Sequence, residues 1–260
     1  DSGQDKKILK PVFRGSLNFF TFKKTIAVVL SSLVMLCNLP AENLISEYRM
    51  KLKQLELNQD DVNSFDRLIM NPYSKTLDYA GTGFTALMLL TPSVMFAAPK
   101  EDYWKIGLEY AETIALAYGV KELIKMNVSR ARPYMYFNGA PVDKFEDDDW
   151  DDSFISGHTT LSFAAASFTT FMYCQYFPDS RFKPLVIAGS YSLAAATAGL
   201  RIASGNHFMT DVLCGAAVGT GIGFLVPLVN SLWFKPSSEK KNSGFEMNVS
   251  PTALMFKYNF

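Results

Sequence analysis

The sequence predicts an all-α protein: a transmembrane bundle of about six apolar helices, with a functional site on loops at one face and a short C-terminal β-hairpin. Six apolar segments recur along the 260 residues, and several approach the roughly 20 residues that a membrane span requires. The mean hydropathy of +0.06 is high for a soluble protein and low for one wholly immersed in lipid. An aromatic content of 14% suits a membrane protein or a large aromatic core.

The N-terminal part of the chain begins with a polar, basic tail over residues 1–24 and continues with an apolar run over residues 25–39. Basic residues before a short apolar run are typical of a signal peptide or of a retained membrane anchor. We expect the anchor, because no small-x-small cleavage site ends the run. The sequence thus predicts a helical domain over residues 25–236, followed by a C-terminal tail over residues 237–260.

The rest of the chain alternates between apolar and polar stretches. Residues 41–58 have apolar side chains at helical spacing between charges, which predicts an amphipathic helix on a surface, and residues 59–78 form a polar connector. Glu109 and Glu112 interrupt one of the later apolar segments, and carboxylates inside a span are costly unless they face the bundle interior or a wet cavity. These later segments cover residues 79–98, 104–123, 159–177, 185–200 and 212–234.

The C-terminal tail changes in character. Apolar residues alternate with polar ones over residues 245–249 and again over residues 254–260, on either side of Ser250-Pro251. Two runs of period two around a proline-containing turn predict a β-hairpin.

The two histidines of the chain both lie among residues suited to phosphate chemistry. His158 follows Ser156 and Gly157 at the start of an apolar helical segment, where free backbone N–H groups bind phosphate oxygens. We expect Ser156 to cap this helix and Gly157 to allow a close approach of the backbone. An ordinary capped helix with a hydrogen-bonded histidine is the alternative interpretation.

The second histidine, His207, lies between Arg201 and Asp211 with the spacing R-x5-H-x3-D. If a helix starts at His207, Asp211 lies one turn later on the same face. Its carboxylate would then hold the imidazole in one tautomer and leave the other ring nitrogen free to attack. The alternative is a loop histidine beside an aspartate that caps a helix.

A third pattern precedes both histidines, Lys125-x6-Arg132-Pro133. Pro133 cannot continue a helix, so Arg132 should lie at an extended corner, where it and Lys125 could clamp two phosphate oxygens. Basic side chains at a membrane interface are the alternative. Arg130 lies off the pattern and is expected at the surface.

The predicted topology brings the three patterns together. Six spans place the loops 125–157 and 201–211 on one side of the membrane and both termini on the other. The basic N-terminus then lies on the cytoplasmic side, in agreement with the usual distribution of positive charge. Further basic residues on that side would be Lys100, Lys105, Arg181, Lys183 and Lys235.

Other features constrain the function by what they exclude. Basic and acidic residues number 25 each, so no global field favours a nucleic-acid partner. Cys37, Cys174 and Cys214 lie in apolar stretches, and we expect neither a disulfide nor a metal cluster. The acidic run 146–152 is expected to be a solvated loop that gates access or binds cations loosely.

Taken in order, K-x6-R-P, S-G-H and R-x5-H-x3-D resemble the motifs of the type 2 phosphatidic acid phosphatase (PAP2) superfamily, which includes lipid phosphatases, acid phosphatases and vanadium haloperoxidases. The motifs run from Lys125 to Asp211, and the likeness extends over the helical domain. Two positions depart from the family pattern, because Ile155 replaces a proline and Leu200 a serine.

The resemblance implies a role for each motif residue. His207 would be the nucleophile that forms a phosphohistidine, Asp211 would hold it, and His158 would protonate the leaving group and then activate water. No metal and no cofactor are expected, because fixed cations would take the place of a metal. The phosphate-binding residues would be Lys125, Arg132, Ser156, Gly157 and Arg201.

The expected function is therefore metal-independent hydrolysis of a phosphate monoester or diphosphate on a lipid. The expected partners are the lipid phosphate and membrane lipids, in a bacterial inner membrane with the active site facing the periplasm; the sequence assigns no oligomeric state. A soluble periplasmic acid phosphatase is the first alternative, favoured by Glu109 and Glu112. A vanadium haloperoxidase and a catalytically dead lipid-phosphate-binding protein are the others.

Overall fold

The computed structural model describes residues 44–233, 246–250 and 253–257. The predicted tail 1–24 and the apolar run 25–39, which includes Cys37, lie outside the described residues. By its internal contacts the chain divides into residues 1–52 and 53–260, and the two units are described separately.

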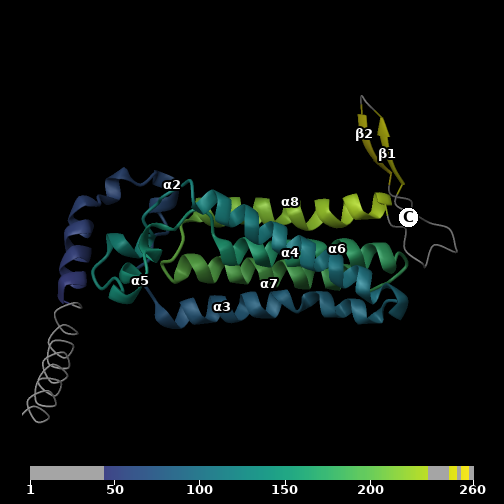
Figure 1. Ribbon diagram of the computed structural model, residues 1–260, viewed down its shortest axis with the longest axis horizontal. Coiled ribbons are helices and arrows are strands. Elements are labelled where there is room, and N and C mark those ends of the chain that lie inside the picture. The colour runs from purple at the N-terminus through teal and green to yellow at the C-terminus, as the bar shows by residue number, and fades with distance from the viewer. Residues whose placement is uncertain (1–43, 234–245, 251–252, 258–260) are drawn as a thin grey trace, which may run out of the picture. The chain divides into compact units, whose positions relative to one another are not determined.

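The described part of the second unit is a bundle of long helices, which confirms the predicted all-α fold class (Figure 1). The central helix is α6, which packs against the other four long helices of the described part. Each long helix coincides with one of the apolar segments predicted between residues 79 and 234. The five are α3 (Lys75–Leu89), α4 (Tyr103–Lys125), α6 (Gly157–Tyr176), α7 (Lys183–Ala203) and α8 (Met209–Trp233).

Short elements connect the long helices. Two short helices lie at one end of the bundle, α2 (Ser64–Arg67) and α5 (Val142–Glu146) (Figure 1). The 3-10 turns are η1 (Gln59–Asp61), η2 (Thr91–Ala97), η3 (Lys100–Asp102), η4 (Pro133–Tyr136) and η5 (Asp149–Asp151). Since α2, α5, η4 and η5 all belong to the loops before α3 and between α4 and α6, the irregular structure concentrates at that end.

Helices α6 and α8 approach each other along a row of glycines. Gly215, Gly219 and Gly223 recur every four residues on α8 and face α6. A Cβ atom on Gly219 would lie 2.1 Å from the carbonyl oxygen of Thr160, and one on Gly223 would lie 2.4 Å from that of Ala164. Small residues at this spacing allow backbones of membrane helices to pack closely. The seam therefore fixes the distance between the start of α6 and the start of α8.

Within residues 44–233, three segments are long and apolar enough to cross a membrane: Lys75–Ala97, Lys183–Ala203 and Met209–Leu232. In the most apolar stretch of each segment, 22% to 28% of the residues are buried, and the others are at least partly exposed. Helices α4 and α6 are not among the three. Charged residues run along α4, and α6 has many hydroxyl side chains, which are buried at the centre of the bundle.

The outer surface of the bundle can be compared with what a soluble acid phosphatase, the first alternative from the sequence, would require. Large apolar side chains are exposed on the outer helices, an arrangement that suits contact with lipid rather than water. Glu112 accepts a hydrogen bond from Asn230 Nδ2 at 2.9 Å, which joins α4 to α8. Among the exposed residues are Leu87, Leu116, Leu185, Leu225, Val229 and Leu232.

Two further sequence predictions concern elements outside the bundle. Residues 44–56 are helical, as the apolar spacing predicted, and the apolar side chains of Leu44, Tyr48 and Leu55 are exposed. The predicted C-terminal hairpin is also confirmed, with β1 (Glu246–Ser250) antiparallel to β2 (Ala253–Lys257) and Glu246 opposite Lys257.

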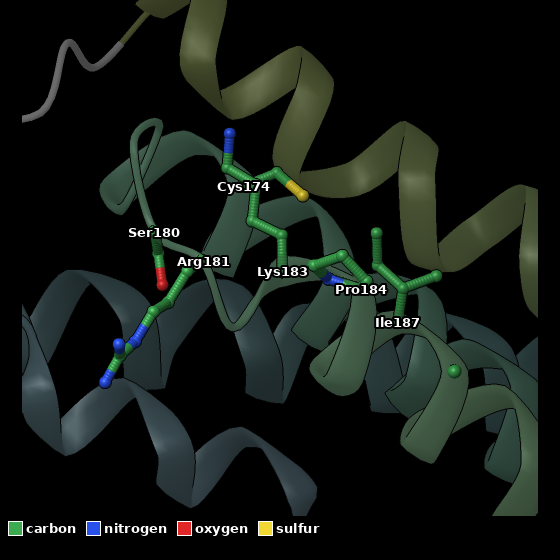
Figure 2. A pocket seen from close by; sticks show the side chains of 7 residues that line it. Cys174, Ser180, Arg181, Lys183, Pro184 and Ile187 are labelled. Carbon is green, nitrogen blue, oxygen red and sulfur yellow. The ribbon is translucent and has the colours of Figure 1, made fainter.

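The end of the bundle opposite the loop-rich end contains the turn between α6 and α7. There Cys174, Arg181, Lys183, Pro184 and Ile187 line an open, mostly apolar pocket (Figure 2). Two of the basic residues predicted to lie on the cytoplasmic side thus occur at one end of the bundle, and the histidine motifs lie at the other.

Candidate active site

The loop between α4 and α6 folds back on itself and brings its two ends together. Arg130 N–H donates to the carbonyl oxygen of Asp151 at 2.6 Å, and Ser153 N–H donates to that of Arg130 at 3.0 Å. Arg132 N–H donates to the carbonyl oxygen of Trp150 at 2.8 Å. These bonds place the lysine–arginine motif directly beside the segment that leads into the S-G-H motif.

His207 lies in the turn between α7 and α8 and is 2% exposed. Its Nδ1 is 2.7 Å from the carbonyl oxygen of Ser153, and its Nε2 is 3.3 Å from Nη1 of Arg132. A carbonyl oxygen only accepts and a guanidinium only donates, so both neighbours require the same tautomer. The proton resides on Nδ1, and the lone pair of Nε2 points toward Arg132.

The charge state of His207 follows from its surroundings. Complete burial lowers the pKa of its imidazole well below the ordinary 6.5, and the nearby charges of Arg132, Arg201 and Lys125 lower it further. The ring is therefore neutral at physiological pH, which is the state that a nitrogen nucleophile requires.

Asp211 does not hold the imidazole directly, and this corrects the expectation from the sequence. Its Oδ2 lies 3.9 Å from Nδ1 of His207. The same oxygen accepts hydrogen bonds from Ser153 Oγ at 2.5 Å and from the backbone N–H of Phe208 at 2.8 Å. The carboxylate lies in the first turn of α8 and is drawn to the free N–H groups there. Ser153 thus contacts both residues, Asp211 with its hydroxyl and His207 with its carbonyl oxygen.

Arg130 was expected at the surface, and this expectation is wrong. Its guanidinium forms ion pairs with Asp211 and with Asp66, the latter at 2.7 Å, and lies 4.1 Å over the ring of Phe208. Asp66 is fully buried and accepts two hydrogen bonds from Thr210. The polar connector before α3 is therefore fixed to the start of α8, because a buried carboxylate needs such partners.

His158 lies in the first turn of α6 and is only partly buried. Its Nε2 is 3.3 Å from the hydroxyl of Thr82 on α3. Burial, together with the charges of Arg201 and Arg132, lowers the pKa of its imidazole to about 3, which places it within the same cluster as His207. The structure therefore brings both histidines to one cationic site.

Of the other two residues of the S-G-H motif, Ser156 differs from the sequence prediction. Ser156 occupies the N-cap position of α6, but its hydroxyl makes no capping hydrogen bond and lies 2.9 Å from that of Thr159. Gly157 allows a close approach, as expected, and the neighbour is the side chain of Lys121, whose Cδ would lie 3.0 Å from an added Cβ.

The three motif cations are each balanced by a carboxylate or a carbonyl. Arg201, 3% exposed, pairs with Asp78, yet its buried Nε has no hydrogen-bond partner among the described residues. Lys125 donates to the backbone oxygen of Asp152 at 2.8 Å. Such buried cations are costly without opposite charge nearby.

The acidic run 146–152 is more than the solvated loop expected from the sequence. Asp149 pairs with Arg132, whose Nε also donates to the backbone oxygen of Asp149 at 2.5 Å. Asp152 lies 3.7 Å from Lys125. The run supplies counter-charges to two motif cations, and this is the physical reason for its position beside the site.

The motifs did not identify three further residues at the site. Lys144 on α5 lies 3.0 Å from Asp78, and Asp78 also accepts a hydrogen bond from the hydroxyl of Tyr73 at 2.9 Å. All three occur outside the motif spacing. Asp78 ends the polar connector predicted over residues 59–78, and no local signal in the sequence distinguishes it from the other polar residues there.

Among residues 44–233 and the two strands, no three or more His, Cys, Asp or Glu side chains are grouped so as to hold a metal ion. The described cysteines, Cys174 and Cys214, are free thiols. The site instead combines a neutral, oriented imidazole with several guanidinium and ammonium groups. Such an arrangement can bind an oxyanion and present a nucleophile to it.

Two curated proteins resemble parts of this chain. The lipid A 1-phosphatase of Porphyromonas gingivalis is 40% identical over 83 residues, 32% of this chain and 17% of that protein. A PA-phosphatase related-family protein of Dictyostelium discoideum is 29% identical over 145 residues, 53% of either chain. This chain thus spans about half or less of the length of these curated relatives.

Among solved structures, a transmembrane PAP2-type phosphatidylglycerolphosphate phosphatase from Bacillus subtilis matches with a TM-score of 0.47 and 20% identity, over 74% of this chain and 98% of that one. The family model for the PAP2 superfamily matches residues 106–235, which is half of the 260-residue chain. That match includes both histidines and all three motif cations, and by it the chain belongs to the PAP2 superfamily.

Proposed function

We propose that this chain is a metal-independent phosphatase that acts on a phosphate monoester or diphosphate of a lipid, through a phosphohistidine intermediate on His207. The observation that carries the proposal is the pair of contacts on the imidazole of His207. Ser153 fixes the proton on Nδ1, and Arg132 lies at Nε2, where a phosphate oxygen would bind. A nucleophile with its lone pair beside a cation suits attack on a phosphoryl group.

The motif cations would hold the phosphate during the reaction. Arg132, Arg201 and Lys125 all act electrostatically on His207, so an anion at Nε2 lies within reach of their charges. The unpartnered Nε of Arg201 is a donor available for a phosphate oxygen. In the transition state these groups would stabilise the charge on the three equatorial oxygens.

His158 would transfer the proton. Nε2 of His207 bonds to phosphorus, the bond from phosphorus to the leaving oxygen breaks, and His158 protonates that oxygen. His158 then takes a proton from water, which attacks the phosphohistidine and releases inorganic phosphate. The negative charge of the bound phosphate would favour the imidazolium form of His158 at the first step.

No step of this mechanism requires a metal. Magnesium commonly bridges phosphate oxygens in phosphoryl-transfer enzymes and neutralises their charge. Here the guanidinium groups of Arg132 and Arg201 would perform this task, with geometry that matches two phosphate oxygens at once.

The lipid character of the substrate follows from the surroundings. The site lies where the helices of the bundle end, beside apolar surfaces suited to lipid. The lipid A 1-phosphatase relative also supports a phosphate on a lipid. Phosphatidate, phosphatidylglycerol phosphate, a polyprenyl diphosphate and a lipid A phosphate all fit this description.

We further propose that the chain resides in a bacterial inner membrane with this site facing the periplasm. Lys100, Lys105, Arg181 and Lys183 lie at the opposite end of the bundle, as the usual excess of positive charge on the cytoplasmic side requires. In a cysteine-free background, a cysteine in place of exposed Glu101 should react with an impermeant thiol reagent only after the cytoplasmic face is opened. Labelling of this cysteine in intact spheroplasts would show that the protein has the opposite orientation, with residue 101 on the periplasmic side.

The decisive test is phosphate release from short-chain phosphatidate in the presence of EDTA, by the wild type and by His207→Ala. We expect release by the wild type alone, and an acid-labile phosphoenzyme that is absent from the variant. Activity that EDTA abolishes would contradict metal independence. Near-normal rates in His207→Ala would overturn the assignment of the nucleophile.

If the wild type releases no phosphate from several lipid phosphates, the two remaining alternatives can be separated. Halide oxidation with vanadate and peroxide would identify a haloperoxidase. Tight binding of lipid phosphate without turnover would identify a binding protein.

A further inference from the structure

Lys144 is a fourth cation at the site, and it belongs to none of the three motifs. It lies on α5, in the loop between α4 and α6. Its Nζ is 3.0 Å from Asp78 Oδ2, 3.4 Å from Asp149 Oδ2 and 3.2 Å from Asn206 Oδ1. Asn206 directly precedes the nucleophile. A lysine that three site oxygens hold in this way is an integral part of the cluster.

Two carboxylates connect Lys144 to the motif cations. Asp149 contacts Lys144 with one oxygen and Arg132 with the other. Asp78 likewise contacts Lys144 through Oδ2 and Arg201 through Oδ1. A single anionic group with two oxygens therefore reaches from Lys144 to either arginine. Phosphate oxygens can make the same contacts, because they too accept from ammonium and guanidinium groups.

Contacts on α3 connect Lys144 to the surroundings of His158. Lys144 pairs with Asp78. The carbonyl oxygen of Asp78 accepts from the hydroxyl of Thr82 at 3.2 Å, the same hydroxyl that contacts Nε2 of His158. The charge of Lys144 acts on His158, together with those of Arg201 and Arg132. The charges that act on His207 include those of Arg132, Arg201 and Lys125. The charges of the two arginines thus act on both histidines, and the charge of Lys144 acts on His158, the group that would protonate the leaving oxygen.

We infer that Lys144 binds the second, non-transferred phosphate of a lipid diphosphate and thereby sets the substrate preference of the site. The inference rests on the proposed phosphatase function. His207 Nε2 bonds to the terminal phosphorus, the bond to the bridging oxygen breaks, and its electron pair stays on the departing lipid monophosphate. His158 protonates that oxygen, and Lys144 neutralises the phosphate that bears it. Water then releases inorganic phosphate from His207.

Asp149 would yield its place when such a substrate binds. Its side chain is 35% exposed, and it lies in a short 3-10 turn rather than in a long helix. A diphosphate with oxygens at both Arg132 and Lys144 replaces the two contacts that this carboxylate makes. When the transferred phosphate directs its three oxygens at Arg132, Arg201 and Lys125, the contact with Lys144 is left for the second phosphate of a diphosphate.

The test compares an isoprenyl diphosphate with the monophosphate of the same chain, for the wild type, Lys144→Gln and Lys144→Arg. Lys51→Gln serves as the control, because Lys51 is an exposed lysine paired with Glu47. We expect Lys144→Gln to lower kcat/KM for the diphosphate about 10- to 100-fold, as for one lost hydrogen bond to a charged group. The monophosphate should change less than about threefold, and Lys144→Arg should restore most of the loss.

Equal losses on both substrates would overturn the inference, because Lys144 would then serve the transferred phosphate or the fold. Unchanged kinetics for Lys144→Gln would overturn it as well, while leaving the phosphatase intact. Absence of any phosphate release by the wild type, from these substrates and from phosphatidate, would instead overturn the proposed function itself.

Discussion

The two histidines of the site differ in burial and in hydrogen-bond partners. His207 is enclosed, and each ring nitrogen has a partner that allows one role only: a carbonyl that accepts and a guanidinium that donates. His158 is partly exposed at the start of α6 and contacts the hydroxyl of Thr82. A hydroxyl both donates and accepts, so this contact suits either protonation state of the ring.

This difference matches what the two steps of the proposed reaction demand. A nucleophile must keep one tautomer, with its lone pair directed at phosphorus, throughout the cycle. A group that gives a proton and then takes one must change its state in every turnover. A rigid pair of partners would hinder that change, whereas a hydroxyl and partial exposure permit it. The physical contrast thus separates the roles that the motifs assign by analogy.

The largest expected effect is the loss of turnover when either histidine is replaced, and its dependence on the leaving group of the substrate distinguishes the two residues. His207→Ala should lower turnover of every substrate by at least about 10⁴-fold, because nothing replaces the nucleophile. His158→Ala should lower turnover of a lipid phosphate by about 10²- to 10⁴-fold. With p-nitrophenyl phosphate, whose leaving group needs no proton, His158→Ala should still form the phosphohistidine and then accumulate it. Phosphoenzyme measured by acid quench distinguishes the two variants.

The opposite pattern of phosphoenzyme accumulation would exchange the roles proposed for His207 and His158. Accumulated phosphoenzyme in His207→Ala, and none in His158→Ala, would make His158 the nucleophile. Circular dichroism of both variants should first show that the helical bundle is retained.

A smaller effect is expected at Asp211, which contacts Ser153 rather than the imidazole. Asp211→Asn should lower kcat about 10- to 100-fold with little change in KM, as for a residue that orients a reactive group through another. Asp66→Asn is the matched control, because Asp66 is equally buried and pairs with the same Arg130 but does not contact Ser153. Its kcat should change less. A loss of about 10⁴-fold for Asp211→Asn would indicate direct control of the tautomer.

The reactive residues could be identified from the sequence because each lies in a short local pattern. Helix ends, a proline and the chain order sufficed to place Lys125, Arg132 and Arg201 with the histidines. The helices could also be predicted from the sequence, because long apolar runs can satisfy their backbone hydrogen bonds in lipid only as helices or closed barrels.

The partners of these residues could not be identified in the same way. Arg130 meets Asp66 across 64 positions of sequence, and Asp78 meets Arg201 across 123. No local spacing encodes such pairs. The first forms where the loop between α4 and α6 meets the connector before α3, and the second forms where α3 packs against α7. The contact of Ser153 with His207 could not be predicted for the same reason. Its carbonyl oxygen takes the position at Nδ1 that the spacing assigned to Asp211, whose Oδ2 lies 3.9 Å from that nitrogen.

The distance between the histidines depends on the seam between α6 and α8, which a third prediction tests. Gly219→Ala places a Cβ against the backbone of α6 and should cost about 1–3 kcal/mol of stability. The rate should fall by less than about tenfold as the two helix starts move apart. Gly221→Ala is the control, because nothing lies within 4 Å of its Cβ position. In detergent, only Gly219→Ala should lower the Tm. Equal decreases in Tm for Gly219→Ala and Gly221→Ala would show that close packing at Gly219 does not determine stability.

The smallest expected effect is a change in protein stability with pH, measured as Tm. The pKa of His207 is lowered by burial in the folded protein, whereas the unfolded chain binds a proton near pH 6.5. The folded state therefore has its full stability above pH 6.5 and loses it as the pH falls below that value. His207→Asn, which does not titrate, should lose less Tm between pH 7 and pH 5 than the wild type. Contributions from the carboxylates are common to both proteins and cancel in this difference. Parallel pH profiles would mean that the ring of His207 takes up its proton as readily in the folded state as in the unfolded chain, and the neutral nucleophile would lose its physical basis.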